Sequence, residues 1–116
     1  MSSKRNLGKY GDIVLLDFDP SAGTEIQKRR PAVIVSNDTY NEFCTTRMVC
    51  PITHTDRPFP LHVALNDKTK TQGVVKCEQV KALDVPIRHI QILESMPDEL
   101  MEEISDILIG CVERNG

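Results

Sequence analysis

The sequence predicts a small, mainly β domain with a C-terminal α-helix. Short apolar segments recur at close spacing and are separated by stretches that contain Gly and Pro, a pattern typical of a small barrel or curled sheet. The C-terminal residues instead repeat apolar side chains every three or four positions, which indicates a helix. A chain of 116 residues is long enough for one hydrophobic core but not for two. We therefore expect a single domain over residues 1–116.

The expected strands begin after a polar N-terminal arm over residues 1–9. The first strand is bounded by Gly11 and Pro20, and Gly23 marks the bend of the loop that follows. Pro31 is tolerable because it stands at the first position of the second strand. The segment HTDRPFP holds two prolines and cannot pair inside a sheet, so we expect an exposed loop there. The expected strands cover residues 11–19, 31–38, 45–53, 61–65 and 73–83, and a further one at 89–93 completes the set.

The C-terminal helix is expected over residues 95–113. Ser95 followed by Asp98 resembles a capping box, and Pro97 suits a first helical turn. Acidic side chains in the first two turns favour the positive end of the helix dipole. We therefore expect a solvated acidic face on a helix packed against the barrel, with an acidic partner-binding tail as the alternative. The apolar stripe consists of Leu100, Met101, Ile104, Ile107, Leu108, Cys111 and Val112.

The charge is unevenly distributed along the chain. The formal net charge is −3, but residues 94–116 hold seven acids and one base, a sum of −6. Residues 1–93 hold the other 13 bases and 10 acids, a sum of +3. The mildly basic body permits a phosphate-binding groove, although the charge by itself does not demand one.

The cysteines and the N-terminal segment indicate an intracellular, cytoplasmic protein. The four cysteines are too far apart for a metal knuckle or a CxxC redox pair, and we expect them to be reduced and mostly buried. A structural disulfide is the alternative. The start MSSKRNLGKYG lacks the apolar core of a signal peptide, and no apolar run reaches membrane-spanning length. We expect neither a metal nor a cofactor. The cysteines are Cys44, Cys50, Cys77 and Cys111.

Arg30 is the first candidate for chemistry. It precedes Pro31, which favours an extended backbone and limits where the side chain can point. Its planar guanidinium offers a fork of donors suited to a phosphate group. The alternative is an ordinary ion pair with a loop acid, Glu25 or Asp19.

Two further segments could supply polar groups. Thr53 ends the third strand with a hydroxyl at the sheet edge. The segment KCEQ at 76–79 alternates, so we expect Lys76 and Glu78 to face one side of the strand and Cys77 and Gln79 to face the other. A cation and a carboxylate on one face could serve acid–base chemistry and phosphate binding, or could form a cross-strand salt bridge.

The segments GDIVLLDFDPSAGTE, RRPAVIVSND, VCPIT and GVVKCEQVKALD, in this order and spacing, resemble the MazF/PemK family of toxin endoribonucleases. The resemblance extends over about residues 10–113. It implies an SH3-like small β-barrel with a C-terminal helix, of the kind shared by MazF, PemK and gyrase-poison toxins. It further implies a homodimer that cuts single-stranded mRNA at short sequences as the toxin of a type II toxin–antitoxin system. The implied partner is an antitoxin that lays an acidic, disordered segment over the RNA groove.

The resemblance also implies roles for particular residues. Arg30 matches the family's essential arginine before proline, and Thr53 matches its strand-end threonine. Relatives often have glycines before this arginine, whereas residues 26–29 are IQKR, so the loop departs from the family pattern at these positions. The implied catalytic residues are Arg30, Thr53 and Glu78, and the implied substrate-binding residues are Thr24, Glu25, Arg29, His54, Lys76 and Gln79.

These residues suit RNA cleavage without metal. The RNA 2′-OH attacks the adjacent phosphate and leaves a 2′,3′-cyclic phosphate and a 5′-OH, which requires a base, an acid and positive charge. Arginine is a poor base, so Arg30 is expected to stabilise the phosphorane and to supply a proton to the leaving oxygen. Glu78 is the expected base if partial burial raises its pKa. His54 could assist, although a lone loop histidine is usually only solvated.

Aromatic stacking partners for RNA bases are scarce in this sequence. Tyr40 and Phe59 are the aromatic residues expected in loops, and core or rim packing is the commoner role for each. The alternative function is a non-catalytic toxin or binding module on the same barrel, of the gyrase-poison type. The resemblance implies that a toxin of that type binds its target protein through a C-terminal tail that contains tryptophan. This chain has no tryptophan.

Overall fold

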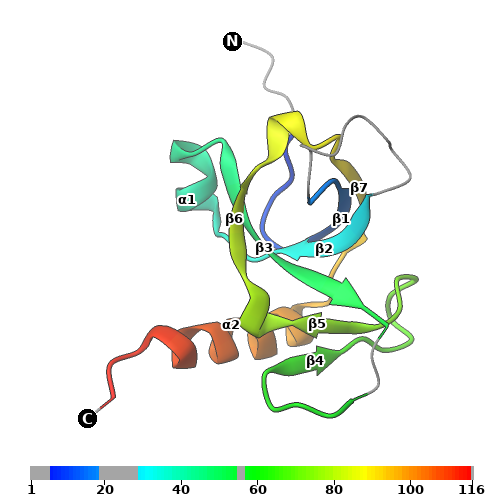
Figure 1. Ribbon diagram of the computed structural model, residues 1–116, viewed down its shortest axis with the longest axis vertical. Coiled ribbons are helices and arrows are strands. Elements are labelled where there is room, and N and C mark those ends of the chain that lie inside the picture. The colour runs from blue at the N-terminus through cyan, green and yellow to red at the C-terminus, as the bar shows by residue number, and fades with distance from the viewer. Residues whose placement is uncertain (1–5, 19–28, 55–56, 116) are drawn as a thin grey trace.

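The computed structural model describes residues 6–18, 29–54 and 57–115. Seven strands, two α-helices and two short 3₁₀ turns follow one another in these segments (Figure 1). In chain order they are β1 (Asp12–Leu16), β2 (Arg30–Ile34), α1 (Asp38–Phe43), β3 (Thr46–Thr53), β4 (His62–Ala64), β5 (Val74–Lys76), η3 (Cys77–Gln79), β6 (Lys81–Asp84), η4 (Val85–Ile87), β7 (Gln91–Ser95) and α2 (Asp98–Val112).

The strands form one curled antiparallel sheet in the order β4-β5-β3-β2-β1-β7, with β6 also paired to β3. The long strand β3 organises this sheet because it pairs with three neighbours along its length. Its first half lies against β6, its middle against β2, and its last residues, Ile52 and Thr53, against β5. The chain therefore has the mainly β architecture with a C-terminal helix that the sequence predicts.

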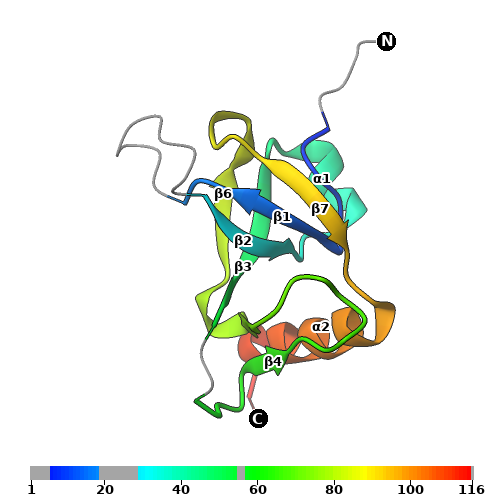
Figure 2. The ribbon, with the colours of Figure 1, turned by 90° about the vertical axis from the view of Figure 1, so that its right-hand side faces the viewer.

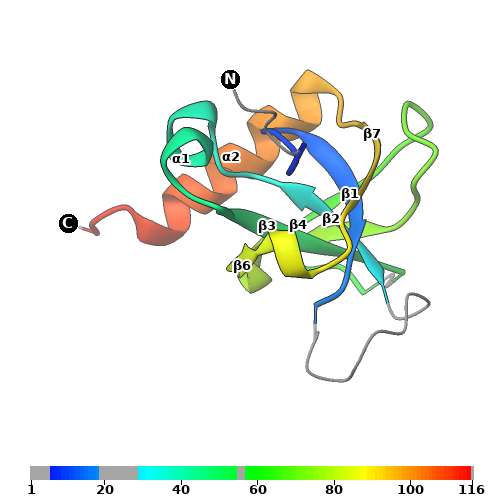
Figure 3. The same ribbon diagram turned by 90° about the horizontal axis from the view of Figure 1, so that it is seen from above.

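Two hydrophobic clusters fill the molecule. One lies between the sheet and α2, where Leu100, Met101 and Ile104 of the helix pack against strand residues such as Val33 and Ile52. Figure 1 shows α2 crossing the end of the molecule beside β4 and β5, and Figure 2 shows the same packing from the side. The second cluster lies inside the curl of β1, β2, β3 and β6. The last turns of α2 extend past the edge of the sheet (Figure 3).

The predicted strand over residues 73–83 is wrong. The chain forms β5, turns through η3, and resumes as β6, so one predicted strand is two strands that pair with different parts of β3. The apolar residues of this segment gave no sign of the break, because Val75, Cys77 and Leu83 are all buried. Tertiary pairing with β3 imposes the turn, and local propensity does not reveal it.

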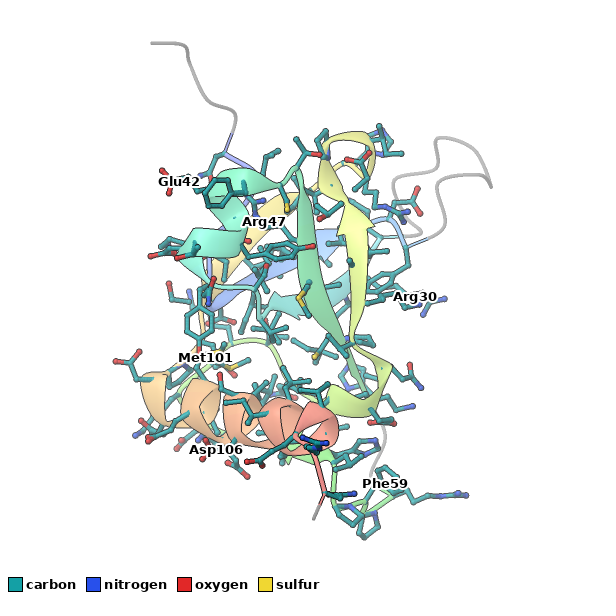
Figure 4. All side chains as sticks on the ribbon, turned by 90° about the vertical axis from the view of Figure 1, so that its left-hand side faces the viewer. Arg30, Glu42, Arg47, Phe59, Met101 and Asp106 are labelled. Carbon is teal, nitrogen blue, oxygen red and sulfur yellow. The ribbon has the colours of Figure 1, made fainter. Side chains whose placement is uncertain are left out.

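The predicted start of the C-terminal helix is also wrong. Ser95 is the last residue of β7 and pairs with Asp12, so it cannot cap a helix. Pro97 occupies the cap position of α2, and no side chain caps the helix there. The acidic residues behave as predicted, since Glu102, Glu103 and Asp106 are exposed. Figure 4 shows Asp106 on the outer face of α2 and Met101 on the face toward the sheet.

A short helix, α1, occupies the region after β2, where the sequence analysis expected strand as far as residue 38. Asn37 caps it, because its side-chain oxygen accepts a hydrogen bond from the Tyr40 amide at 2.9 Å. Asn37 before an acidic residue is the sequence signal that indicates this helix start.

All four cysteines are free thiols, as predicted, but only Cys50 and Cys77 are fully buried, and Cys111 is exposed. Within the described residues, no helix is long and apolar enough to cross a membrane.

Candidate active site

A groove of about 420 Å³ lies beside the C-terminal end of β3. Arg30 begins β2, Thr53 ends β3 and Gln79 ends η3, so the pairing of β3 with its neighbours brings three distant parts of the sequence to one place. His54 follows Thr53 at the rim. The groove is lined by Phe18, Arg30, Pro31, Pro51, Ile52, Thr53, His54, Gln79 and Lys81.

Arg30 is held at the start of a buried strand with its side chain outside. Its backbone pairs with Leu16 of β1, and the residues that follow Pro31 in β2 are fully buried. The residue itself is exposed, and Figure 4 shows its side chain projecting away from the sheet. No described residue pairs with its guanidinium, and the proposed partners Glu25 and Asp19 lie outside the described residues. A fork of donors therefore faces the groove from a fixed backbone.

Thr53 presents a hydroxyl that lacks a partner among the described residues. Its Oγ1 is buried, and the backbone beside it is crowded by Gly73, whose Cα approaches the Thr53 carbonyl. A buried hydroxyl without a hydrogen bond costs about 1–3 kcal/mol. A bound ligand with a suitable oxygen would remove this cost, so the hydroxyl is suited to substrate binding.

Phe18 and Lys81 form a wall of the groove that the sequence analysis missed. Phe18 follows the end of β1, and Lys81 begins β6. The Lys81 Nζ atom lies 5.6 Å from the centre of the Phe18 ring, within the range of a cation–π contact. Lys81 and Arg30 make the lining positive, since no carboxylate occurs among its described residues. The groove therefore suits a phosphate with an adjacent flat ring.

The turn after η4 fixes both flanks of the groove. Arg88 donates hydrogen bonds to the carbonyl oxygens of Asp17 and Phe18 at 3.0 and 2.8 Å. Arg29 donates to the carbonyl oxygen of His89 at 3.2 Å. The predicted RNA-facing residue Arg29 is therefore half-buried and tied to this turn. The role of Arg88 was missed because its partners are backbone atoms more than 60 residues away in sequence.

Glu78 does not line this groove. It lines a second hollow, of about 560 Å³, between η3, Met48 in the first half of β3, and α2, together with apolar residues such as Val80 and Ile109. The predicted strand alternation for Lys76 and Glu78 is wrong because residues 77–79 form a 3₁₀ turn. In that turn successive side chains point in different directions. Cys77 and Glu78, which the alternation places on opposite faces, consequently line the same hollow, whereas Gln79 lines the groove.

The carboxylate of Glu78 is bound by His62. The His62 Nε2 atom lies 3.0 Å from Glu78 Oε2, and a carboxylate only accepts, so Nε2 carries the proton. Burial raises the pKa of Glu78, but the hydrogen bond from His62 and the charges of His62 and Lys76 outweigh it. The pKa of Glu78 is therefore lowered, not raised as a buried base would require. Glu78 is ionised at neutral pH.

The remaining candidates lie elsewhere. Lys76 opposes His62 in the β4–β5 ladder and is not among the residues that line either hollow. Phe59 packs its ring against His62, with the ring centres 4.9 Å apart, so it belongs to the rim of β4. Tyr40 shares a hydrogen bond of 2.7 Å with Thr46. Thr24 and Glu25 lie outside the described residues.

Among the described residues, no three His, Cys, Asp or Glu side chains are grouped so as to hold a metal ion.

Comparison with protein families gives one match over most of the chain. Residues 9–110 match the model described as PemK-like, MazF-like toxin of type II toxin–antitoxin system. Endoribonuclease PemK of Escherichia coli is 34% identical over 98 residues, which is 81% of this chain and 74% of that protein. Endoribonuclease toxin ChpB of Escherichia coli strain K12 is 34% identical over an alignment that covers 95% of this chain and 98% of that protein.

Solved structures have the same fold. MazF of Deinococcus radiodurans (Form-I) superposes with a TM-score of 0.79 at 29% identity and covers 92% of this chain and 97% of that chain. A chain of the MazE–MazF crystal structure from the same organism (Form-II) has a TM-score of 0.79 at 25% identity, with 93% and 97% covered.

Proposed function

The chain belongs to the MazF/PemK family of toxin endoribonucleases of type II toxin–antitoxin systems, and from this premise we propose that it cuts single-stranded mRNA at short sequences without a metal ion. The observation that supports an active site in this groove is that Arg30 and Thr53 both line it, and that the Thr53 hydroxyl has no partner among the described residues. Both groups suit a phosphate, and both stand on strands whose positions are fixed before substrate arrives.

The proposed reaction is attack of the RNA 2′-OH on the adjacent phosphate. The bond from phosphorus to the 5′ oxygen breaks, which leaves a 2′,3′-cyclic phosphate and a 5′-OH, and translation and growth stop. Arg30 stabilises the charge of the phosphorane through its fork of donors and supplies a proton to the leaving oxygen. Thr53 holds a non-bridging oxygen by a hydrogen bond.

The positive wall of the groove supports single-stranded RNA as substrate. Unpaired bases can be turned out and stacked on an aromatic ring, and Phe18 provides such a ring beside the phosphate-binding groups. Lys81, His54 and Gln79 line the same groove and offer polar groups for the backbone and base edges. Arg29, which donates to the His89 carbonyl, would contact RNA outside the groove.

We also propose that the carboxylate of Glu78 contacts the RNA strand beyond the groove. It is ionised and therefore able to accept a hydrogen bond or a proton, and η3 is the boundary between its hollow and the groove. An RNA strand that leaves the groove over η3 would reach it. Lys76 would add positive charge on that side.

Two protein partners complete the proposal. The first is a second copy of this chain, which would cover the α2 side of the apolar hollow, at Ile109 and Val112, and leave its η3 side with Glu78 open to RNA. The second is a cognate antitoxin, whose acidic segment would occupy the positive groove in place of RNA. Relatives of known structure include the MazE–MazF complex.

The test is cleavage of a long single-stranded RNA by purified protein in excess EDTA, with end-group analysis of the products. We expect discrete cuts with 2′,3′-cyclic phosphate ends. Arg30→Ala should lower the rate by about 10²–10³-fold, the usual cost of losing a donor to a developing oxyanion. Arg30→Lys should stay well below wild type, because a point charge does not replace the planar fork.

Glu78→Gln and Lys76→Ala, tested in the same assay, report whether that side of η3 acts on RNA. Full activity of the Arg30→Lys variant would show that cleavage does not require the planar guanidinium of Arg30. A folded wild-type protein that cuts none of several unrelated RNAs would favour the non-catalytic toxin.

A further inference from the structure

We infer that His54 is the general base that removes the proton from the RNA 2′-OH. This inference rests on the proposed function, and it starts from the groups that line the groove. Arg30 and Lys81 are cations that carry only donors. Histidine is the residue type that most often serves as a general base, and His54 is the one histidine among the described lining residues.

The position of His54 suits this role. It directly follows Thr53, whose carbonyl is packed against Gly73 and whose hydroxyl is buried in the groove. The imidazole is therefore carried by a backbone fixed on its N-terminal side, while its own side chain is exposed to an incoming strand. A phosphate held by Thr53 and Arg30 would place its neighbouring ribose within reach of His54, the residue that follows the end of β3.

The histidine–carboxylate pair elsewhere in the molecule is not an equivalent base. His62 donates Nε2–H to Glu78, and its other nitrogen, Nδ1, is buried without a partner among the described residues. His62 is also not among the residues that line the groove. The pKa of Glu78 is lowered by the same contact, which weakens it as a base, and its carboxylate faces the other hollow.

The step balances without a further reactant. The 2′-OH proton passes to the neutral imidazole of His54 as the 2′ oxygen forms its bond to phosphorus. The bond from phosphorus to the 5′ oxygen breaks, and that oxygen takes a proton from Arg30 or from water. The imidazolium of His54 then gives its proton to solvent, and solvent replaces the proton that Arg30 or water supplied, so each group regains its starting form.

The first experiment compares His54→Ala with wild type under single-turnover conditions. We expect the cleavage rate to fall by about 10²–10⁴-fold, the usual contribution of a general base. RNA affinity, measured with a 2′-deoxy substrate at the cleavage site, should change by less than about tenfold, because Arg30, Thr53 and Lys81 remain. His89→Asn is the matched control, since His89 is an exposed histidine outside the groove at φ 54°, where Asn is well tolerated.

The second experiment identifies which proton His54 moves. Added imidazole should restore part of the activity of His54→Gly, in proportion to its neutral form. A substrate with sulfur in place of the bridging 5′ oxygen has a leaving group that needs no proton. A base is still required on this substrate, so His54→Ala should lose the same factor as on normal RNA.

Recovery of His54→Ala to the wild-type rate on the sulfur substrate would overturn the inference, because it would make His54 the acid. Equal cutting of normal RNA by wild type and His54→Ala would overturn it too, and would leave the proposed function intact. Absence of cutting by wild type would instead defeat the proposed function.

Discussion

Gly73 shows how a single residue shapes the candidate site. Its φ is +127°, a conformation that L side chains rarely adopt, and an added Cβ would lie 2.4 Å from the Thr53 carbonyl oxygen. The obstructing atom belongs to the backbone of β3 and cannot move aside as a flexible side chain could. The glycine therefore lets the segment before β5 pack closely on the strand end that carries Thr53 and His54.

Gly73→Ala is expected to lower the free energy of unfolding by about 1–3 kcal/mol, from backbone strain and overpacking. Urea denaturation measures this loss. Cleavage by the folded fraction should also fall, because Thr53 must shift.

Gly110→Ala is the opposing control. Gly110 lies in α2 with nothing within 4 Å of an added Cβ. Replacing a helical glycine by alanine should raise stability by up to about 1 kcal/mol. A Gly73→Ala protein as stable as wild type would show that the close approach has no energetic importance.

At the scale of elements, Glu94 joins β7 to the loop between β4 and β5. Its carboxylate accepts hydrogen bonds from the Lys70 and Thr71 amides at 3.1 and 2.8 Å and from the Thr71 hydroxyl at 2.7 Å. Burial raises the pKa of Glu94, but these hydrogen bonds outweigh it and lower the pKa overall. The ionised form is therefore the one that stabilises the fold.

The contribution of Glu94 to stability therefore depends on pH. A carboxyl whose pKa is lower in the folded state stabilises the protein above its unfolded pKa, and this stability is lost as the pH falls through the folded pKa. Glu94→Gln should lower the free energy of unfolding at neutral pH by about 1–2 kcal/mol. The difference from wild type should shrink in acid, where both side chains are neutral.

Urea titrations at several pH values measure this effect. Glu102→Gln, on the exposed face of α2, is the control and should change stability little at any pH. A constant difference between Glu94→Gln and wild type from neutral to acid pH would contradict the assignment.

At the scale of the whole molecule, the apolar hollow beside α2 is the surface on which we expect the second copy to pack. Tyr10, Ile109 and Val112 line it and are 37%, 57% and 84% exposed. Tyr10 is bound to α2 through Ser105 at 2.8 Å, so the N-terminal segment and the helix form one wall. The end of α2 extends past the sheet, where a partner can reach it (Figure 3).

Sedimentation equilibrium should give twice the chain mass of 13.1 kDa for wild type. Ile109→Asp combined with Val112→Asp should give a monomer, because a carboxylate in an apolar interface is strongly unfavourable. Phe43→Asp is the control, since Phe43 is 82% exposed and is not among the residues that line the hollow. A monomeric wild type, or a double variant that remains a dimer, would reject this surface.

Local periodicity predicts the elements more reliably than their ends. The continuous apolar run of β1 and the helical stripe of α2 depend on neighbours in sequence, so the pattern reveals them. The division of residues 73–83 into β5, η3 and β6 depends on where β3 passes from one partner to another. No short stretch of sequence contains that information.

The sequence by itself determined the mainly β domain, the C-terminal helix, and the presence of Arg30 before Pro31 and of Thr53 at a strand end. These features follow from residue type and spacing along a short stretch of chain. Only the tertiary structure decided that Phe18 and Lys81 share the groove with them, and that Glu78 turns away toward His62. The physical reason is that side chains far apart in sequence meet through strand pairing, and a three-residue 3₁₀ turn redirects side chains that strand alternation would place elsewhere.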